Sequence, residues 1–393
     1  MDVVCHRDLK KTWPVFLASL LLFVGSGLLE TVVSYRTSVT GYDSRTAGIV
    51  MTSFYVGFLF GTFLAPRLIS QLRHDWTFRF YAVAVMLTAW LLGQSASPVE
   101  WSILQVLNGL SMGGIYVVIE SWLNLQSRRR SRGFLFALYM MCWYAGLAMG
   151  QVSLSVGLED LAGYFRIVCV AVGLSLVSLS HPLVRPPKGV ILRPFRLSDL
   201  AEIRTTSLSG SFLIGVSIGC ICGMAPVFAH TAGFSIQQVA YFCVAFIFGA
   251  AVFQFPLSWL GDRVERTRLK LFLALSCAMI CLGGYWLPDG SFLPLLAGAF
   301  LIGGFSFPVY SLSVTDAYDN LKTTGAALSA SAALLLVNGL GSAVGPFWCG
   351  LLMEHGNNGF FLLLLLAHLI LAIHLASQIV FSKRNAIFRA ARN

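Results

Sequence analysis

Two acidic residues, Glu30 and Glu120, lie within long apolar stretches of this 393-residue sequence. Ionisable side chains are costly to keep in such surroundings and commonly mark functional sites. Glu30 stands sixteen residues after Pro14, which is about 24 Å along a helix. Ser26 and Ser34 flank it by one turn on the same helix face. Because a carboxylate removed from water is easier to protonate, this pattern predicts that Glu30 binds and releases protons.

Glu30 also has a structural interpretation, in which its carboxylate transfers no proton. The side chain would then reach the outer membrane interface or form an ion pair with an arginine such as Arg36. Both interpretations place Glu30 in the outer third of a membrane, and the sequence leaves both open.

Glu120 stands near the end of its apolar stretch, and Arg128, Arg129, Arg130 and Arg132 follow it. The helix dipole disfavours a carboxylate at a helix C-terminus, so Glu120 needs a nearby cation. The arrangement predicts an ion pair between Glu120 and Arg132 or the arginines before it, acting as a gate at the membrane edge. Direct contact with a solute is the alternative role for Glu120.

The composition identifies the kind of chain that holds these acids. It is 57% hydrophobic and 11% charged, with a mean hydropathy of +0.77, whereas soluble domains are about 45–50% apolar and about 25% charged. The net charge of +10 arises from cations in short connectors between apolar runs. We therefore interpret the basic excess as membrane topology, with lipid headgroups as contacts, and expect no nucleic-acid partner.

Apolar segments of spanning length recur along the whole sequence and predict an all-α membrane protein with twelve transmembrane helices. The expected spans are 13–35, 46–69, 78–96, 99–123, 133–157, 161–181, 207–229, 236–259, 269–287, 291–314, 324–352 and 358–381.

Lysine and arginine predict the orientation of these spans. Of the 27 basic residues, all but Arg36, Arg45 and Arg166 fall on one side of the expected membrane. Connectors rich in Lys and Arg face the cytoplasm, so both termini are expected there. The longest connector, 182–206, is also cytoplasmic and separates an N-terminal six-helix half, 1–181, from a C-terminal half, 207–393.

The two halves resemble each other when the numbering is shifted by 192 residues. The segment 40–48 then lies on 232–240, Gly27 on Gly219 and Gly57 on Gly249. Parallel six-helix repeats with a cytoplasmic linker suit a bundle that binds its solute between the halves near the membrane midplane. Rocking one half against the other would expose that site to each side in turn.

The sequence at this point resembles the major facilitator superfamily over essentially its whole length. The segment 259–268, WLGDRVERTR, is similar to that family's loop motif G-x-L-x-D-R-x-G-R-R. The resemblance implies that Asp262, Arg263 and Arg266 form a latch that breaks as the halves move. The equivalent stretch of the first half has Ser70 where the motif has its acid.

Four further segments resemble the YcaD-like group of this superfamily, whose substrates are poorly defined. They are 53–62, 117–124, Arg132 with Gly133, and 137–146. The patterns of drug/proton antiporters are weak, because Gln105 replaces an arginine and Gln151 replaces a proline after Gly150. Drug antiport is therefore disfavoured.

The resemblance also implies which residues line the solute cavity, because spans 1, 4, 7 and 10 line it in this architecture and spans 2, 5, 8 and 11 flank them. Each polar or aromatic candidate has a packing role as its alternative, since helix–helix hydrogen bonds use the same residue types. The substrate-binding candidates are Tyr55, Tyr116, Trp143, Tyr144, Gln151, Gln254, Tyr310 and Asn338.

The sequence contains no nucleotide-binding loop, metal-ligand cluster or nucleophile–base pair, and its cysteines read as small apolar residues. We therefore expect no enzyme activity, no cofactor and no metal. The expected function is secondary transport of a small organic solute by alternating access in a bacterial inner membrane, with proton symport favoured and the protein acting as a monomer. A proton-driven exporter of amphiphilic compounds or drugs and a non-transporting membrane sensor are the alternatives.

Overall fold

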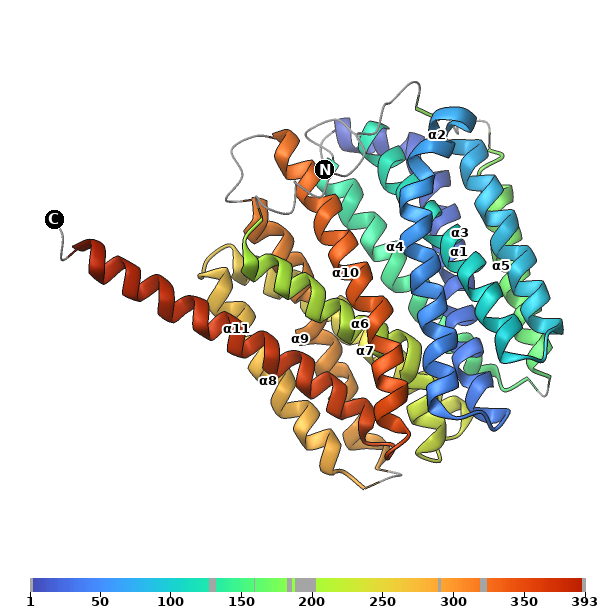
Figure 1. The fold of residues 1–393 in the computed structure, drawn as a ribbon. Helices are drawn as coiled ribbons and strands as arrows, with labels where there is room; N and C mark the ends of the chain where they lie inside the picture. Colours follow the sequence, from blue (N-terminus) through green and yellow to red (C-terminus); the bar gives the residue numbers. More distant parts are fainter. Residues whose placement is uncertain are drawn as a thin grey trace.

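The computed structural model describes residues 3–126, 132–158, 160–181, 186–187, 203–288, 291–318 and 324–390. Within these ranges the regular structure is helical, and the helices pack into one bundle (Figure 1). The helices before the central connector are α1 Val3–Val39, α2 Ser44–Gln94, α3 Pro98–Gln126, α4 Arg132–Ser153, the short η1 Leu154–Val156 and α5 Leu161–Ser178. Those after it are α6 Thr205–Thr231, α7 Ile236–Gly261, α8 Arg266–Trp286, α9 Phe292–Tyr318, α10 Thr324–Met353 and α11 Gly359–Ala390.

Among the described residues, eleven helices are long and apolar enough to cross a membrane. The all-helical membrane fold expected from the sequence is therefore confirmed. Two expected spans, 46–69 and 78–96, fall within the single 51-residue α2, so the structure records one helix where the sequence suggested two. The expected span 291–314 was too short, because α9 continues to Tyr318.

The two expected spans in α2 are two helical segments joined at Arg73, whose backbone angles of φ 68° and ψ 164° are not helical. Phe58, before this point, packs on Gly113 of α3, whereas Tyr81, after it, packs on Gly114. In a straight helix, residues 58 and 81 would be about 34 Å apart. Their contacts with adjacent residues of α3 show that the chain reverses direction at Arg73.

Polar caps define where several helices begin at the loop end opposite Arg73. The Asp43 carboxylate accepts a hydrogen bond of 3.0 Å from the Thr46 backbone N–H at the start of α2. Bonds from Thr46 hold the pKa of Asp43 below its ordinary value, because they stabilise the charged form. Ser235 and Gln238 form a capping box at the start of α7. These caps satisfy backbone donors that would otherwise be unpaired.

Helix pairs in both halves pack through glycines at positions related by the expected repeat. A side chain at Gly27 would collide with the backbone of Leu147, so α1 and α4 approach closely there. Gly219, 192 residues later, makes the corresponding approach to Ser342, which joins α6 to α10. Gly57 packs in the same way against α3 and Gly249 against α9. Small residues that allow such contacts are typical of membrane helix packing.

The halves contact each other at the end of the bundle that carries the caps. The Ser34 hydroxyl donates to the Gly223 carbonyl at 2.6 Å, joining α1 to α6. The Thr52 hydroxyl donates to the Ala343 carbonyl at 3.1 Å, joining α2 to α10. Gly48 brings the backbones of α2 and α10 together in the same region. These contacts hold the two halves together at the end that the sequence predicts to be extracytoplasmic.

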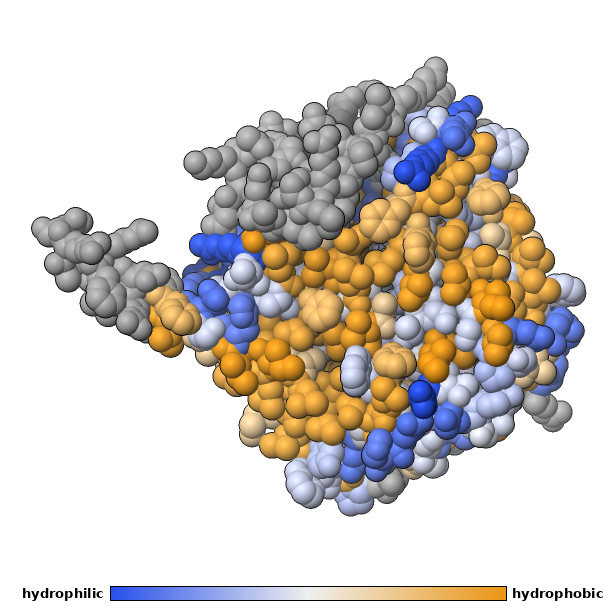
Figure 2. Space-filling view, in the orientation of Figure 1, coloured by the Kyte–Doolittle hydropathy of each residue, from blue (hydrophilic) through white to orange (hydrophobic). Residues whose placement is uncertain are grey.

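The outer surface of the bundle is largely apolar. Figure 2 shows apolar residues across most of the described surface in view, with hydrophilic residues gathered at its edges. Large side chains stand fully in this band, including Phe255 at 78% exposure and Phe60 at 62%. Soluble proteins rarely expose such patches, and a lipid-facing belt accounts for them.

Candidate functional site

Glu30 points into the bundle from α1, where its carboxylate accepts a 3.1 Å hydrogen bond from the Ser26 hydroxyl one turn earlier. Ser34, the other expected neighbour, bonds instead to the carbonyl of Gly223. Glu30 therefore has a neutral partner on its own helix and faces the junction of the two halves.

Arg36 does not pair with Glu30, which contradicts one form of the structural interpretation. Its guanidinium donates to the backbone carbonyls of Leu92 at 2.6 Å and Ser95 at 2.8 Å. It also lies over the Trp101 ring at 4.9 Å. Arg36 thus joins α1 to the end of α2, and its charge is already occupied there.

Three residues from other helices lie close enough to Glu30 to interact with it electrostatically. They are Tyr55 of α2, Tyr116 of α3 and Cys222 of α6. The Trp143 indole of α4 donates a short hydrogen bond to the Tyr116 hydroxyl. We call these residues, with Glu30, the Glu30 cluster. Both halves contribute to it, because α6 belongs to the second half and the other helices belong to the first.

A second set of polar contacts joins the halves through Gln254. The Tyr144 hydroxyl of α4 donates to the Gln254 side-chain oxygen at 3.2 Å. The amide of Gln254, on α7, donates in turn to the Ser311 hydroxyl of α9 at 2.9 Å. Tyr144 and Gln254 were predicted to bind substrate, and the structure brings them into direct contact across the interface.

The remaining substrate-binding candidates occupy other places. Gln151 is buried in α4, and its side-chain oxygen has no hydrogen-bond partner among the described residues. Asn338 of α10 donates to the Ser211 carbonyl of α6 at 3.0 Å, as a packing residue would. Tyr310 packs against the apolar core of the second half. The structure therefore groups the first-half aromatics around Glu30 and leaves these three apart from them.

Glu120 lies half-buried near the cytoplasmic end of α3. Its charge interacts with Tyr116 and with Tyr139 of α4, so it lies below the Glu30 cluster in the same interior. Its predicted partners Arg128–Arg130 lie outside the described residues, as does the side chain of Arg132. The predicted gate at Glu120 therefore stays a prediction.

The loop motif of the second half forms a network around Arg266. Its guanidinium contacts the Asp262 carboxylate at 3.0 Å and donates to the Thr315 carbonyl at 3.0 Å. Because Asp262 is 72% exposed, that ion pair contributes little on its own. The carbonyl contact is the part that ties the end of α7 to the end of α9. Arg263 instead lies over the Trp259 ring at 3.7 Å.

A buried ion pair that the sequence analysis missed lies beside this motif. The Lys270 ammonium of α8 and the Asp316 carboxylate of α9 approach to 2.7 Å, and both side chains are buried. Hydroxyls of Thr206 and Ser207 on α6 each donate to the same carboxylate at 3.2 Å. The signal in the sequence was an acid just past one apolar run and a lysine at the start of another.

The bundle and its interior define a class before any comparison. Long apolar helices surround polar clusters that both halves build, as in a membrane carrier with its site between two domains. The sequence matches the Major Facilitator Superfamily over residues 15–346 and 207–385. This chain belongs to that superfamily of membrane transporters.

A relative and two solved structures place the chain more closely. It is 24% identical over 341 residues to the uncharacterised MFS-type transporter YcaD of Escherichia fergusonii, which covers 86% of this chain and 87% of the relative. The nucleoside transporter NupG superposes with a TM-score of 0.76 at 14% identity, over 94% of this chain and 99% of that one. A D-xylose–proton symporter gives 0.68 at 15%, over 91% and 97%. The resemblance to the YcaD group is confirmed, and the solved structures support the fold.

Proposed function

We propose that this protein is a proton-coupled symporter that moves a small organic solute across a bacterial inner membrane. The observation that carries the proposal is the place of Glu30, an acid in the bundle interior whose cluster is built by both halves. A carboxyl group in that position can exchange a proton as the halves separate. The protein works as a monomer, since each chain supplies both halves of the site.

The proposed topology has twelve crossings with both termini in the cytoplasm. The reversal of α2 at Arg73 supports two crossings by that helix, because its segments both pack along α3. The distribution of Lys and Arg supports the orientation. In this arrangement, residues 1–181 and 207–393 are the two moving halves, and 182–206 is the cytoplasmic linker.

Alternating access would act on the contacts between these halves. The Ser34–Gly223 and Thr52–Ala343 bonds hold the extracytoplasmic end closed in this structure. Opening that end requires both bonds to break, and the network around Arg266 would change at the opposite end. Only neutral hydrogen bonds and glycine packing are lost at the outer end, so the change is modest in free energy.

A neutral, ring-bearing solute suits the interior best. Rings of Tyr55, Tyr116 and Trp143 offer flat apolar faces with polar edges near Glu30. The buried Lys270 is already paired with Asp316, so it is not available to hold an organic anion. The nucleoside and xylose carriers that share the fold transport solutes of the ring-bearing kind, which supports this choice.

Transport in proteoliposomes tests the proposal. Purified protein is reconstituted, a pH gradient is imposed, and uptake of labelled nucleosides and pentoses is measured. We expect accumulation against the solute gradient that a protonophore abolishes. If no solute moved in either direction under any gradient, the transporter assignment would be wrong, and net proton-driven efflux would favour the exporter.

The Glu30→Gln variant tests the coupling role. Glutamine keeps the size and the hydrogen bond from Ser26 but cannot exchange a proton. We expect loss of accumulation driven by the pH gradient, while exchange of labelled for unlabelled solute continues. Glu120→Gln is the matched control, and it should retain accumulation because Glu120 is assigned to gating. Unchanged proton-driven accumulation in Glu30→Gln would exclude Glu30 as the coupling group.

A further inference from the structure

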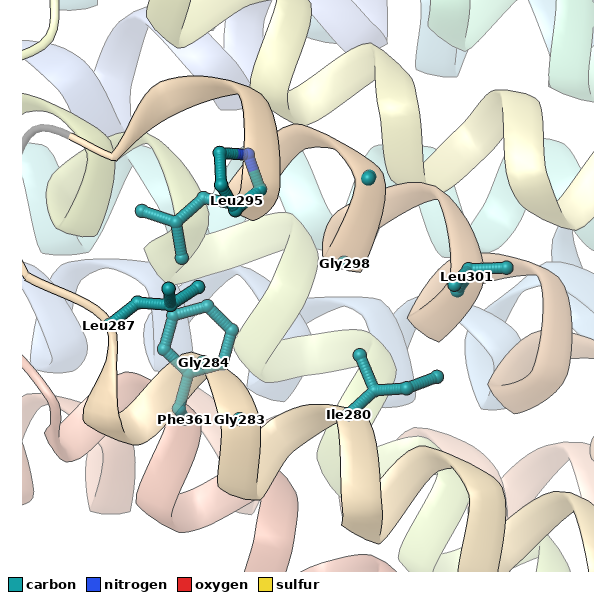
Figure 3. Close-up of a pocket in the computed structure, with 10 residues that line it drawn as sticks. Ile280, Gly283, Gly284, Leu287, Leu295, Gly298, Leu301 and Phe361 are labelled. Atoms are coloured by element: carbon teal, nitrogen blue, oxygen red, sulfur yellow. The ribbon is translucent and has the colours of Figure 1, made fainter.

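An apolar cavity of about 300 Å³ opens on the outside of the second half, between α8 and α9 (Figure 3). Its floor is formed by the buried residues Gly284, Leu295 and Phe361, the last of which comes from α11. Gly283 and Pro294 stand exposed at its rim. All the side chains that line it are apolar, and its volume is at the lower end of the range for ligand pockets.

The cavity exists because two glycines face it from opposite helices. No atom lies within 4 Å of the place where a Cβ at Gly283 would sit, and the nearest atom to one at Gly298 is a methyl carbon of Ile280 at 3.7 Å. Gly249 and Gly303 differ, because a Cβ there would collide with a neighbouring backbone. A glycine inside a helix disfavours that helix. At positions 283 and 298 no close helix contact offsets this cost, and the result is a groove.

The surroundings of the groove show what covers it. Met279, Trp286 and Leu293 flank it and are 69%, 76% and 74% exposed, so this face is directed toward lipid. Tyr285 and Trp286, at the end of α8, are residue types that gather at the level of the lipid headgroups. Water gains no hydrogen bonds in an apolar cavity, and an empty one forfeits dispersion contacts with its walls. Hydrocarbon chains are the material that the membrane supplies at this depth.

We propose that this groove binds one acyl chain of a phospholipid, with the headgroup at the level of Trp286. The chain lies between Gly283 and Gly298 and reaches Phe361 at the floor. Because α8 and α11 pack against each other, a chain seated there stabilises the second half as a unit. The inference requires only that α8 and α9 span the membrane, and it is independent of Glu30 and of the transported solute.

Photocrosslinking from the lipid tests this assignment. The full-length protein is reconstituted in vesicles of phosphatidylethanolamine and phosphatidylglycerol that contain a phospholipid with a diazirine in the middle of one acyl chain. After irradiation, the crosslinked residues are identified by peptide mass spectrometry. We expect an excess of adducts on the segment 280–301 over the lipid-facing segment 170–177 of α5.

Filling the groove should remove that excess. The Gly283→Leu/Gly298→Leu variant places side chains in the open space, so adducts on 280–301 should fall to the α5 level. Gly173→Leu is the matched control, because no atom lies within 4 Å of a Cβ there either and the groove is elsewhere. If the double variant does not fold, Gly283→Ala should still lower the excess in part.

Two outcomes would overturn the proposal. Equal labelling of 280–301 and 170–177, unchanged by filling, would mean that the groove holds no chain beyond the ordinary lipid contact. Protein–protein crosslinks through 280–301 that filling abolishes would assign the groove to a second copy of this protein. Failure of the Glu30→Gln experiment affects neither result, so the two proposals can be judged separately.

Discussion

Two buried ionisable residues in this chain have contrasting surroundings. Lys270 contacts Asp316 at 2.7 Å and the Thr206 carbonyl at 3.3 Å, so its charge is matched within the bundle. Glu30 has only the Ser26 hydroxyl as a hydrogen-bond partner. A charge that is fully paired is held in place, whereas a carboxylate with one neutral partner can change its protonation state. This contrast is why we assign Lys270 to structure and Glu30 to coupling.

The Lys270–Asp316 pair permits a stability prediction. Lys270→Met leaves Asp316 buried without its cation, which should lower the free energy of unfolding by about 3–5 kcal/mol. The double variant Lys270→Met/Asp316→Leu removes both charges and should recover most of that loss. Denaturant titration of purified protein in micelles measures the difference. Equal destabilisation in the single and double variants would show that the pair itself, and not the unpaired charge, decides stability.

The elements of the fold differ in how far the sequence predicted them. Apolar length fixed the helices well, because each must hide its backbone from lipid. The end of α9 was placed too early, since Asp316 reads as a membrane boundary until Lys270 of another helix neutralises it. The resemblance led to Tyr116, Trp143 and their neighbours, but only the meeting of α1 with α6 places a residue of the second half beside Glu30.

Cys222 shows the limit of prediction at the site. The sequence analysis treated it as a small apolar residue, and nothing in its spacing links it to Glu30. In the fold it lies near Glu30 and Tyr55, because the repeated glycine contacts bring α6 beside α1. Ser311 was missed for the same reason, since its contact with Gln254 depends on how α7 crosses α9.

The reversal of α2 gives a prediction at the scale of one element. Arg73 has φ 68° and ψ 164°, a region that only glycine occupies without strain. Arg73→Gly should therefore stabilise the protein by about 1–3 kcal/mol. The Arg73–Asp75 pair lost in this variant is exposed on the arginine side and contributes little. Thermal unfolding measures the change, with Gln71→Gly as the control that should destabilise because Gln71 is helical.

At the scale of the whole molecule, the closed end and the repeat belong to one design. The glycine contacts that pair α1 with α4 recur between α6 and α10, so each half moves as a packed unit. The bonds between the halves at the outer end are few and neutral. Strong packing within each half and weak bonding between them is the arrangement that rocking requires.

The proposed topology makes a prediction that separates it from a single crossing by α2. Thr40 and Ala96 are exposed near the two ends of the α2 segments, and Gln71 is exposed near the reversal. In intact cells, Thr40→Cys and Ala96→Cys should react with a membrane-impermeant thiol reagent added outside. Gln71→Cys should react only after the cells are permeabilised. The cysteines that the structure describes are buried or half-buried in the helices, which keeps the background low.

The same labels test orientation as well as the number of crossings. The positive charge of the connectors predicts that position 71 faces the cytoplasm together with both termini. If positions 40 and 96 were labelled on opposite sides, α2 would cross once and the twelve-span topology would be wrong. If all three sides were inverted, the crossings would stand, but Ser34 and Thr52 would close the cytoplasmic end instead. Glu30 would then lie on the inner side of the membrane, and a proton entering from outside would have to pass the Gln254 contact first.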